Sequence, residues 1–263
     1  MKLDLFGKNA LVCGSSKGIG KASAIQLASL GANVTLVSRS PDLMSNIIKQ
    51  MDMDISKGQD HDFLYADFTD SDDLQKKLKG LVLKRSYHIL VNNTGGPPGG
   101  PITEAQLTSF KEAFEQHLLC NHILVQSLKK GMIEEGYGRI INIISTSVKA
   151  PLDNLGVSNT IRGAVASWAK TMANELGVHG ITVNNVLPGF TDTLRLQEIF
   201  ETRAANEGLS YEEVKKQLAL TVPLQRIADP NEIGSVVAFL ASPAASYVNG
   251  TSIPVDGGRT RSI

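Results

Sequence analysis

The sequence is poor in the features that mark secreted or membrane proteins. Its 263 residues contain only two cysteines, Cys13 and Cys120, so a disulfide framework is excluded and a reducing cytoplasm is expected. No apolar run reaches the roughly 18 residues that a membrane span requires. The first residues show neither the long apolar core nor the cleavage site of a signal peptide. We therefore expect a cytoplasmic protein with no membrane partner.

An excess of charge of one sign is also missing. Lys and Arg together number 26, as do Asp and Glu, so the formal net charge is zero. Without a strong global field, no nucleic-acid partner is expected. The five histidines show no metal-ligand spacing, because His117 and His122 are five residues apart on a predicted helix. We expect no metal site.

The chain alternates short apolar runs with segments of helical spacing. Most of the runs are continuously apolar, as parallel strands buried on both faces are. The pattern predicts α/β architecture: one doubly wound Rossmann domain over residues 1–263, with a parallel sheet of about seven strands and helices on both faces. Strands are predicted at 9–13, 34–38, 63–66, 87–91, 139–144, 181–186 and 251–255, and helices at 19–30, 42–51, 72–84, 104–134, 157–176 and 231–240.

Two long loops interrupt this alternation. Residues 95–101 read GGPPGGP, which permits no regular structure. Residues 190–222 are charged, only partly helical by pattern, and contain no strand. Loops of this length in compact domains are often functional. We expect residues 190–222 to form a flap over the carboxyl edge of the sheet, where a substrate cleft would lie.

Glycines follow the first predicted strand directly. Gly14, Gly18 and Gly20 lie in CGSSKGIG, and the next predicted helix begins at Ile19. Glycines at such a turn let the backbone approach a pyrophosphate, and the helix N-terminus supplies N–H donors. The alternative is a tight strand–helix turn with no ligand. Because the motif lies in the first βα unit, we favour a nucleotide site.

A cation follows the second predicted strand. Arg39 lies about 20 residues beyond the glycines, where an acidic residue would favour the free ribose hydroxyl of NAD. An arginine there accommodates a 2′-phosphate, and Lys17 would add positive charge. The alternative is that Arg39 is a solvated surface cation. We favour NADP(H) over NAD(H).

These motifs resemble those of the short-chain dehydrogenase/reductase family, and in particular its 3-oxoacyl-acyl-carrier-protein-reductase-like branch. CGSSKGIG resembles TGxxxGIG, residues 92–95 (NNTG) resemble NNAG, and GITVNNVLPGFTDT and the C-terminal PVDGG are similar to later family signatures. The resemblance implies a nicotinamide cofactor, a small carbonyl or alcohol substrate, and a homo-oligomer, either a tetramer or a dimer. It marks these cofactor-binding positions: Gly14, Ser16, Lys17, Gly18, Ile19, Gly20, Arg39, Asp67, Asn93, Gly95, Arg162, Pro188, Gly189, Thr191 and Thr193.

The family's catalytic positions are only half preserved. Asn121 and Ser145 match the family asparagine and serine, but the YxxxK pair expected about 13 residues after the serine is replaced by Ser158 and Arg162. Serine is a far weaker acid than tyrosine and is shorter. Arginine does not release its proton in proteins. Ser158 and Arg162 therefore suit cofactor binding better than acid–base chemistry.

One other group is a candidate acid. Lys149 lies four residues after Ser145, and a desolvated lysine there would act near neutral pH, although an exposed loop lysine is the favoured interpretation. Two hypotheses follow for the whole chain. The first is a reductase or dehydrogenase acting on a ketone such as a 3-oxoacyl thioester, with Ser145 polarising the carbonyl. The second is an NADP(H)-binding or sensing protein without turnover.

Overall fold

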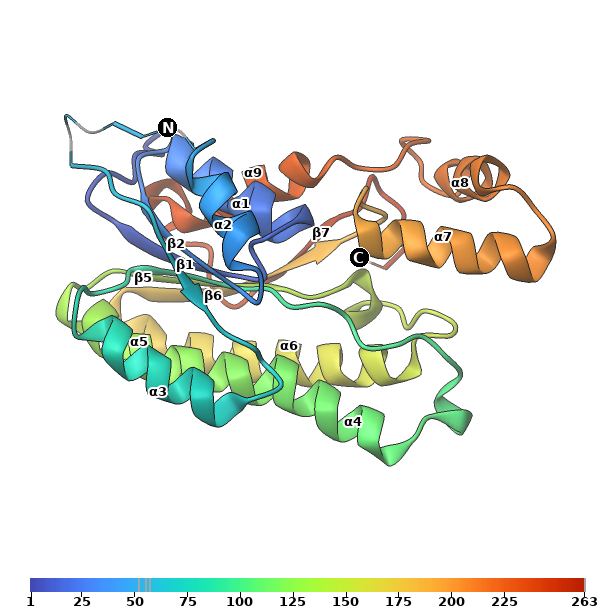
Figure 1. Ribbon diagram of the computed structural model, residues 1–263, viewed down its shortest axis with the longest axis horizontal. Coiled ribbons are helices and arrows are strands. Elements are labelled where there is room, and N and C mark those ends of the chain that lie inside the picture. The colour runs from blue at the N-terminus through green and yellow to red at the C-terminus, as the bar shows by residue number, and fades with distance from the viewer. Residues whose placement is uncertain (52, 55, 57, 263) are drawn as a thin grey trace.

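Seven parallel strands form one sheet, as predicted. The computed structural model describes residues 1–51, 53–54, 56 and 58–262. The strand order is β3-β2-β1-β4-β5-β6-β7, so the chain winds outward from β1 in one direction and then from β4 in the other (Figure 1). The strands are β1 (Asn9–Cys13), β2 (Asn33–Ser38), β3 (Asp62–Tyr65), β4 (Ile89–Asn92), β5 (Gly138–Ile143), β6 (Ile181–Pro188) and β7 (Ser252–Val255).

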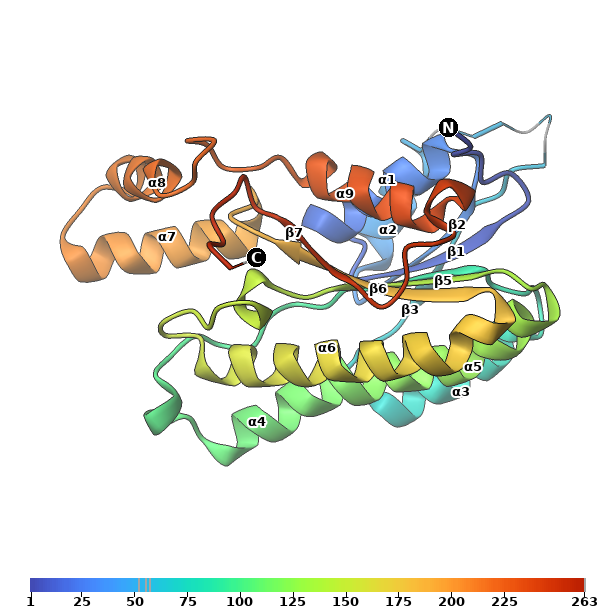
Figure 2. The same cartoon turned by 180° about the vertical axis from the view of Figure 1, so that it is seen from behind.

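Helices cover both faces of the sheet (Figures 1 and 2). One layer contains α1 (Gly18–Ser29), α2 (Pro41–Ile48) and α9 (Pro230–Ala241); the other contains α3 (Ser71–Val82), α5 (Cys120–Glu134) and α6 (Gly156–Leu176). Successive strand residues enter opposite layers: Val12 lies in the core under α1 and α9, whereas Leu11 and Cys13 lie in the core under α3, α5 and α6. This explains why the strands read as unbroken apolar runs.

Two predicted segments differ in detail from the structure. The helix expected over 104–134 is divided into a 3₁₀ turn (Ile102–Glu104), α4 (Leu107–Phe114), a π-helical turn (Glu115–Leu119) and α5. The partly helical loop at 190–222 contains two full helices, α7 (Leu194–Glu207) and α8 (Tyr211–Leu220). Thr193 caps α7, Gly208 ends it in the left-handed conformation, and Ser210 and Glu213 form a capping box on α8.

Buried asparagines join four neighbouring strands, at the level of the carboxyl ends of β4 and β5. The Asn92 amide donates to Asn142 Oδ1 (2.8 Å), Asn142 donates to Asn185 Oδ1 (2.9 Å), and Asn185 donates to Ser252 Oγ (3.0 Å). The four residues are direct partners in the strand register, and Asn142 is fully buried. We call this row the asparagine ladder. It pairs the amide donors of Asn92, Asn142 and Asn185 inside an apolar layer, where an unpaired polar group is costly, although Oδ1 of Asn92 has no partner among the described residues.

The asparagine ladder predicts a large effect of one truncation. Asn142→Ala leaves the Asn92 amide donor and the Asn185 carbonyl without partners, so the free energy of unfolding should fall by about 2–4 kcal/mol. Urea unfolding measures it. Asn206→Ala, on the exposed surface of α7, is the control and should change stability by less than about 0.5 kcal/mol. Equal stabilities of the two variants would show that the ladder does not stabilise the sheet.

Candidate active site

The glycine turn between β1 and α1 is tightly packed. Gly14 and Gly18 have positive φ (57° and 56°), and a Cβ on Gly20 would lie 2.2 Å from the carbonyl oxygen of Gly14. The side-chain amide of Asn93, just after β4, donates to the carbonyls of Cys13 (3.3 Å) and Gly14 (3.2 Å). Side chains at these glycines would therefore strain or displace the turn. We call residues 14–20 the phosphate loop.

The start of α1 suits an anion. Lys17 occupies the N-cap position but makes no side-chain hydrogen bond to the helix, and the first turn holds no acidic residue. Lys17 is exposed, Ser16 is half-buried, and Ile19 packs on the core beneath. The uncapped N–H groups and the positive end of the helix dipole thus face the glycine turn, where a pyrophosphate would be bound.

Arg39 and Asp67 meet beyond β2 and β3. An Arg39 guanidinium nitrogen lies 3.8 Å from an Asp67 carboxylate oxygen, and the Arg39 side chain is exposed. The pKa of Asp67 is lowered, mainly by a hydrogen bond from the backbone N–H of Thr69. Burial opposes this effect, and the Thr69 side chain and the charge of Arg39 add smaller lowering effects. The two predicted cofactor residues therefore form one charged pair at the ribose end of the predicted dinucleotide site.

The segment after β6 closes the other side of this site. A Cβ on Gly18 would lie 3.1 Å from the methyl group of Thr193, so this segment approaches the phosphate loop. Pro188 ends β6, Gly189 packs on Asp256, and the buried Thr191 donates to the Gly189 carbonyl (3.2 Å). The described residues fit a dinucleotide: they provide a glycine turn without room for side chains, an uncapped helix start, and an adjacent loop rich in threonine.

The predicted reaction centre lies at the end of β5. Ser145 is half-buried, and its Oγ accepts a hydrogen bond from the backbone N–H of Ser147 (3.1 Å). Ser158 is half-buried in the first turn of α6. One turn later, Arg162 is buried and donates to the carbonyl of Ile143 on β5 (2.8 Å). Burial lowers the pKa of Arg162 to about 10, so it still carries its charge at neutral pH.

Two other predicted residues lie in contrasting environments. Asn121 is buried in the first turn of α5, directly after the π-helical turn. Lys149 is exposed at the end of the 3₁₀ turn Thr146–Val148. Exposure removes the desolvation that a lysine acid requires, so the structure does not favour Lys149 as a proton donor. Gly95 is exposed too, at the start of the GGPPGGP loop.

Two residues that the sequence did not single out as site residues lie beside this centre. Thr94 Oγ1 is 2.5 Å from Nδ1 of His117, in the π-helical turn. Burial, and to a smaller extent the charge of Arg162, lowers the pKa of His117 to about 3, so the imidazole is neutral at physiological pH. The signal available in the sequence was the i, i+4 spacing of His117 and Asn121, which places both on one helix face.

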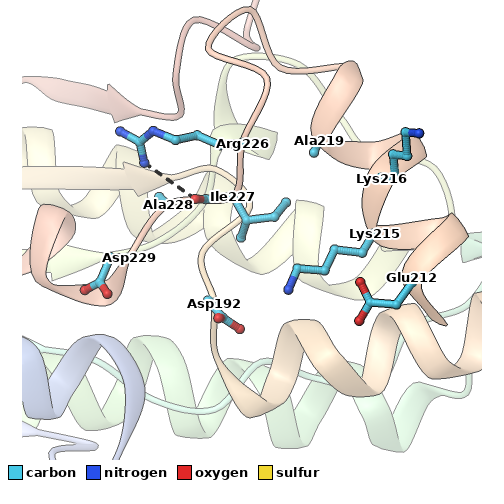
Figure 3. A pocket seen from close by; sticks show the side chains of 9 residues that line it. All are labelled: Asp192, Glu212, Lys215, Lys216, Ala219, Arg226, Ile227, Ala228 and Asp229. Atoms are coloured by element: carbon cyan, nitrogen blue, oxygen red, sulfur yellow. Dashed lines mark hydrogen bonds between the residues drawn. The ribbon is translucent and has the colours of Figure 1, made fainter.

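A separate hollow lies beside α8. It has a volume of about 440 Å³, and Figure 3 shows the Lys215 ammonium directed toward the carboxylates of Asp192 and Glu212. Neither the phosphate loop nor Ser145 nor Arg162 lines it. Its other wall is the segment before α9, where Arg226 makes a bidentate pair with Glu232 (2.6 and 2.7 Å). This hollow is therefore separate from the candidate active site.

Metal-ligand clusters and membrane-spanning helices are both absent from residues 1–51, 53–54, 56 and 58–262. In that part of the chain, no group of three or more His, Cys, Asp or Glu side chains is placed to hold a metal ion. No helix in that part combines the length and the apolar character needed to cross a membrane.

The fold and the phosphate loop define a dinucleotide-binding α/β protein with a polar centre at the carboxyl edge of its sheet. Comparison with known proteins narrows this class. The profile of the family described as enoyl-(acyl carrier protein) reductase matches residues 14–260. The 3-oxoacyl-[acyl-carrier-protein] reductase of Vibrio cholerae is 34% identical over 259 residues, which are 97% of this chain and 98% of that protein. The chain belongs to the short-chain dehydrogenase/reductase family of oxidoreductases.

Other relatives agree in fold and cofactor class. The NADPH-dependent reductase BacG of Bacillus subtilis is 28% identical over 261 residues, covering 97% of this chain and 99% of its own. The structure of L-sorbose reductase from Gluconobacter frateurii, in complex with NADPH and L-sorbose, superposes with a TM-score of 0.92 over the full length of both chains at 27% identity. These similarities support a nicotinamide cofactor for this chain.

The tight packing of the phosphate loop predicts that a single added methyl group, at Gly20, weakens the binding of NADPH. Gly20→Ala places a Cβ against the Gly14 carbonyl, so NADPH affinity should fall on the order of tenfold or more, which corresponds to about 1.4 kcal/mol or more. Quenching of the protein fluorescence by NADPH measures it. Gly80→Ala is the matched control, because its Cβ would meet nothing within 4 Å on α3. Unchanged affinity of Gly20→Ala would place the nucleotide elsewhere.

Proposed function

We propose that this chain is an NADP(H)-preferring reductase of a small carbonyl compound, with a ketone such as a 3-oxoacyl thioester as the substrate class. The observation that carries the proposal is the sharing of one sheet edge by the phosphate loop, after β1, and Ser145, after β5. A nucleotide held at the first reaches toward the second along the carboxyl ends of the strands. The match to 3-oxoacyl-[acyl-carrier-protein] reductases supports the substrate class.

A bound nicotinamide supplies hydride chemistry to this site. The chain's own residues divide the remaining tasks. Arg39 would pair with a 2′-phosphate, and Asp67 would orient the adenine end. Arg162 would keep a positive charge beneath the ribose, and its planar fork suits two neighbouring hydroxyls. Ser145 would donate a hydrogen bond to the carbonyl oxygen, while Asn121 would hold the helix of the active site or a water molecule.

We also propose that residues 190–222 cover the substrate. The guanidinium of Arg195 on α7 donates to the carbonyl of Pro97 in the GGPPGGP loop (2.8 Å), so two segments about 100 residues apart meet. Both α7 and α8 project beyond the sheet (Figure 1). Apolar residues such as Leu194 and Ile199 are exposed on α7 and suit an acyl chain or a ring. From the sequence, we further propose a cytoplasmic homo-oligomer.

The second candidate is an NADP(H)-binding or sensing protein without turnover. The short Ser158 hydroxyl in place of tyrosine and the exposure of Lys149 favour it. The two candidates share the cofactor site and differ only in chemistry at Ser145.

The proposed contact between Arg39 and a 2′-phosphate predicts that the protein prefers NADPH to NADH. Arg39→Glu should weaken NADPH on the order of 10–100-fold and leave NADH within a fewfold, because a charge-assisted contact is worth roughly 1.5–3 kcal/mol. Equilibrium titrations with both cofactors measure this. Lys49→Glu, an exposed cation at the end of α2, changes the net charge equally and should alter neither affinity strongly. Tighter binding of NADH than of NADPH by the unaltered protein would contradict the proposal.

The proposed role of Ser145 predicts how its removal changes NADPH-dependent turnover. NADPH oxidation is followed at saturating cofactor with a panel of 3-oxoacyl thioesters, simple ketones and quinones. Ser145→Ala should lower turnover roughly tenfold or more, since it removes the donor to the carbonyl oxygen, while NADPH affinity stays unchanged. NADPH binding without turnover on any member of the panel would favour the binding protein.

Restoring the family pair separates the two candidates further. Ser158→Tyr combined with Arg162→Lys should lower an existing activity, because the serine and arginine belong to a working site of another design. A steep rise in ketone reduction from near nothing would instead show that the protein had lost the chemistry of its family.

A further inference from the structure

Two of the departures from the family pattern, at Thr94 and Arg162, act on one side chain. Thr94 occupies the alanine position of NNAG, and Ser158 and Arg162 occupy the tyrosine and lysine positions. Thr94 is hydrogen-bonded to His117, and the charge of Arg162 acts on the same imidazole. His117 therefore interacts with two replaced positions, Thr94 and Arg162, that are more than 60 residues apart in the chain. Replacements that meet at one side chain are expected when one altered mechanism has taken the place of another.

His117 is held in an unusual backbone conformation. It lies in the π-helical turn Glu115–Leu119, which joins α4 to α5, one turn before Asn121. Its side chain is 3% exposed. A π-helical turn inside a helix is rare and is frequently found at functional sites, because it changes the direction of the side chains that it carries. Here it orients the imidazole toward Thr94 at the end of β4.

Burial, aided by the positive charge of Arg162 on α6, keeps His117 neutral by lowering its pKa. Glu115, on the same turn, is directed away and accepts a hydrogen bond from Ser71 at the start of α3 (2.5 Å). Cys120 on α5 has its pKa raised by burial, so its thiol is uncharged. A neutral imidazole has one N–H donor and one acceptor, and it can polarise a carbonyl group as a hydrogen-bond donor.

Resting on the reductase function proposed above, we propose that His117 takes the place of the family tyrosine as the group that supplies the proton to the reacting carbonyl oxygen, with Thr94 as its positioning residue and proton relay. Thr94 donates its hydroxyl proton to Nδ1, which leaves the N–H on Nε2. Among the described residues, no hydrogen bond engages Nε2, so a substrate carbonyl would not compete with a protein acceptor for its proton.

The step balances with one hydride and one solvent proton. The carbonyl carbon gains a hydride from the reduced nicotinamide, the C=O π pair moves to oxygen, and that oxygen takes the Nε2 proton of His117. As Nε2 releases this proton, Nδ1 takes the hydroxyl proton of Thr94. After the alcohol leaves, Nε2 takes a proton from water and Nδ1 returns its proton to Thr94, so one solvent proton restores the starting tautomer. Thr94 is half-buried and precedes the exposed Gly95, so solvent is close to the relay. Alcohol oxidation is the reverse.

Matched histidine variants test the proposal. His117→Asn keeps an amide near the Nδ1 position but lacks Nε2. It should lower kcat roughly 10²–10⁴-fold, the usual contribution of a general acid, with NADPH affinity and Tm close to those of the unaltered protein. His122→Asn is the control: this imidazole, on the same helix, is half-buried and accepts from the Trp168 indole (3.3 Å). Its kcat should not change.

A second readout is independent of turnover. Nitrogen-15 NMR of the labelled ring, between about pH 5 and 8, should show His117 neutral with its proton on Nε2. Thr94→Ala should abolish the preference between the two tautomers. A proton fixed on Nδ1 would overturn the proposal, because Nε2 would then have nothing to donate.

The outcomes distinguish this proposal from the one on which it rests. If the unaltered protein oxidises NADPH with a carbonyl of the panel and His117→Asn does so equally well, the reductase function stands and the role of His117 is wrong. If no carbonyl is reduced while NADPH binds, the proposed function fails and the role of His117 fails with it. A loss confined to His117→Asn, together with the Nε2–H tautomer, supports both.

Discussion

Because all seven strands run in one direction, the segments that follow β1, β2, β4, β5 and β6 begin at the same edge of the sheet. Every part of the candidate site depends on this constraint. The phosphate loop, Arg39, Thr94, Ser145 and Thr193 come from five different segments and reach one region only because their strands are parallel and in register. The asparagine ladder fixes four of the strands near this edge, in the layer that α5 and α6 cover.

The electrostatics of the site follow from one buried cation. Arg162 has no carboxylate partner among the described residues and is compensated by the Ile143 carbonyl. Buried charges normally have a partner, so the site is suited to a polar or anionic ligand above Arg162. The same charge disfavours protonation of His117. In the resembled family, a lysine at this position lowers the pKa of a tyrosine; here the arginine adds to the effect of burial, which is the main reason that the imidazole stays neutral.

The sequence alone predicted the sheet and the phosphate loop, because period, glycine position and apolar runs are local signals. It also placed Ser158 and Arg162 one turn apart on one helix. It did not predict the π-helical turn or the Thr94–His117 contact, because both depend on how α4, α5 and α6 pack. The asparagine ladder was missed for the same reason: Asn92, Asn142 and Asn185 are partners only through strand register. The helices at 194–220 were underestimated because their caps, Thr193 and Ser210, lie in a segment with weak apolar periodicity.

The proposed reaction requires this site to transfer hydride with Ser158 and Arg162 at the positions where the family resemblance places tyrosine and lysine. The most direct measurement is a single-turnover reaction with excess protein, NADPH deuterated at the transferred position of C4, and a mixture of carbonyl compounds. Mass spectrometry then detects any alcohol product that has gained one deuterium. We expect deuterium on the carbinol carbon of at least one product, and its transfer to be roughly tenfold or more slower in Ser145→Ala. Bound NADPH that keeps all its deuterium in every mixture would contradict the account.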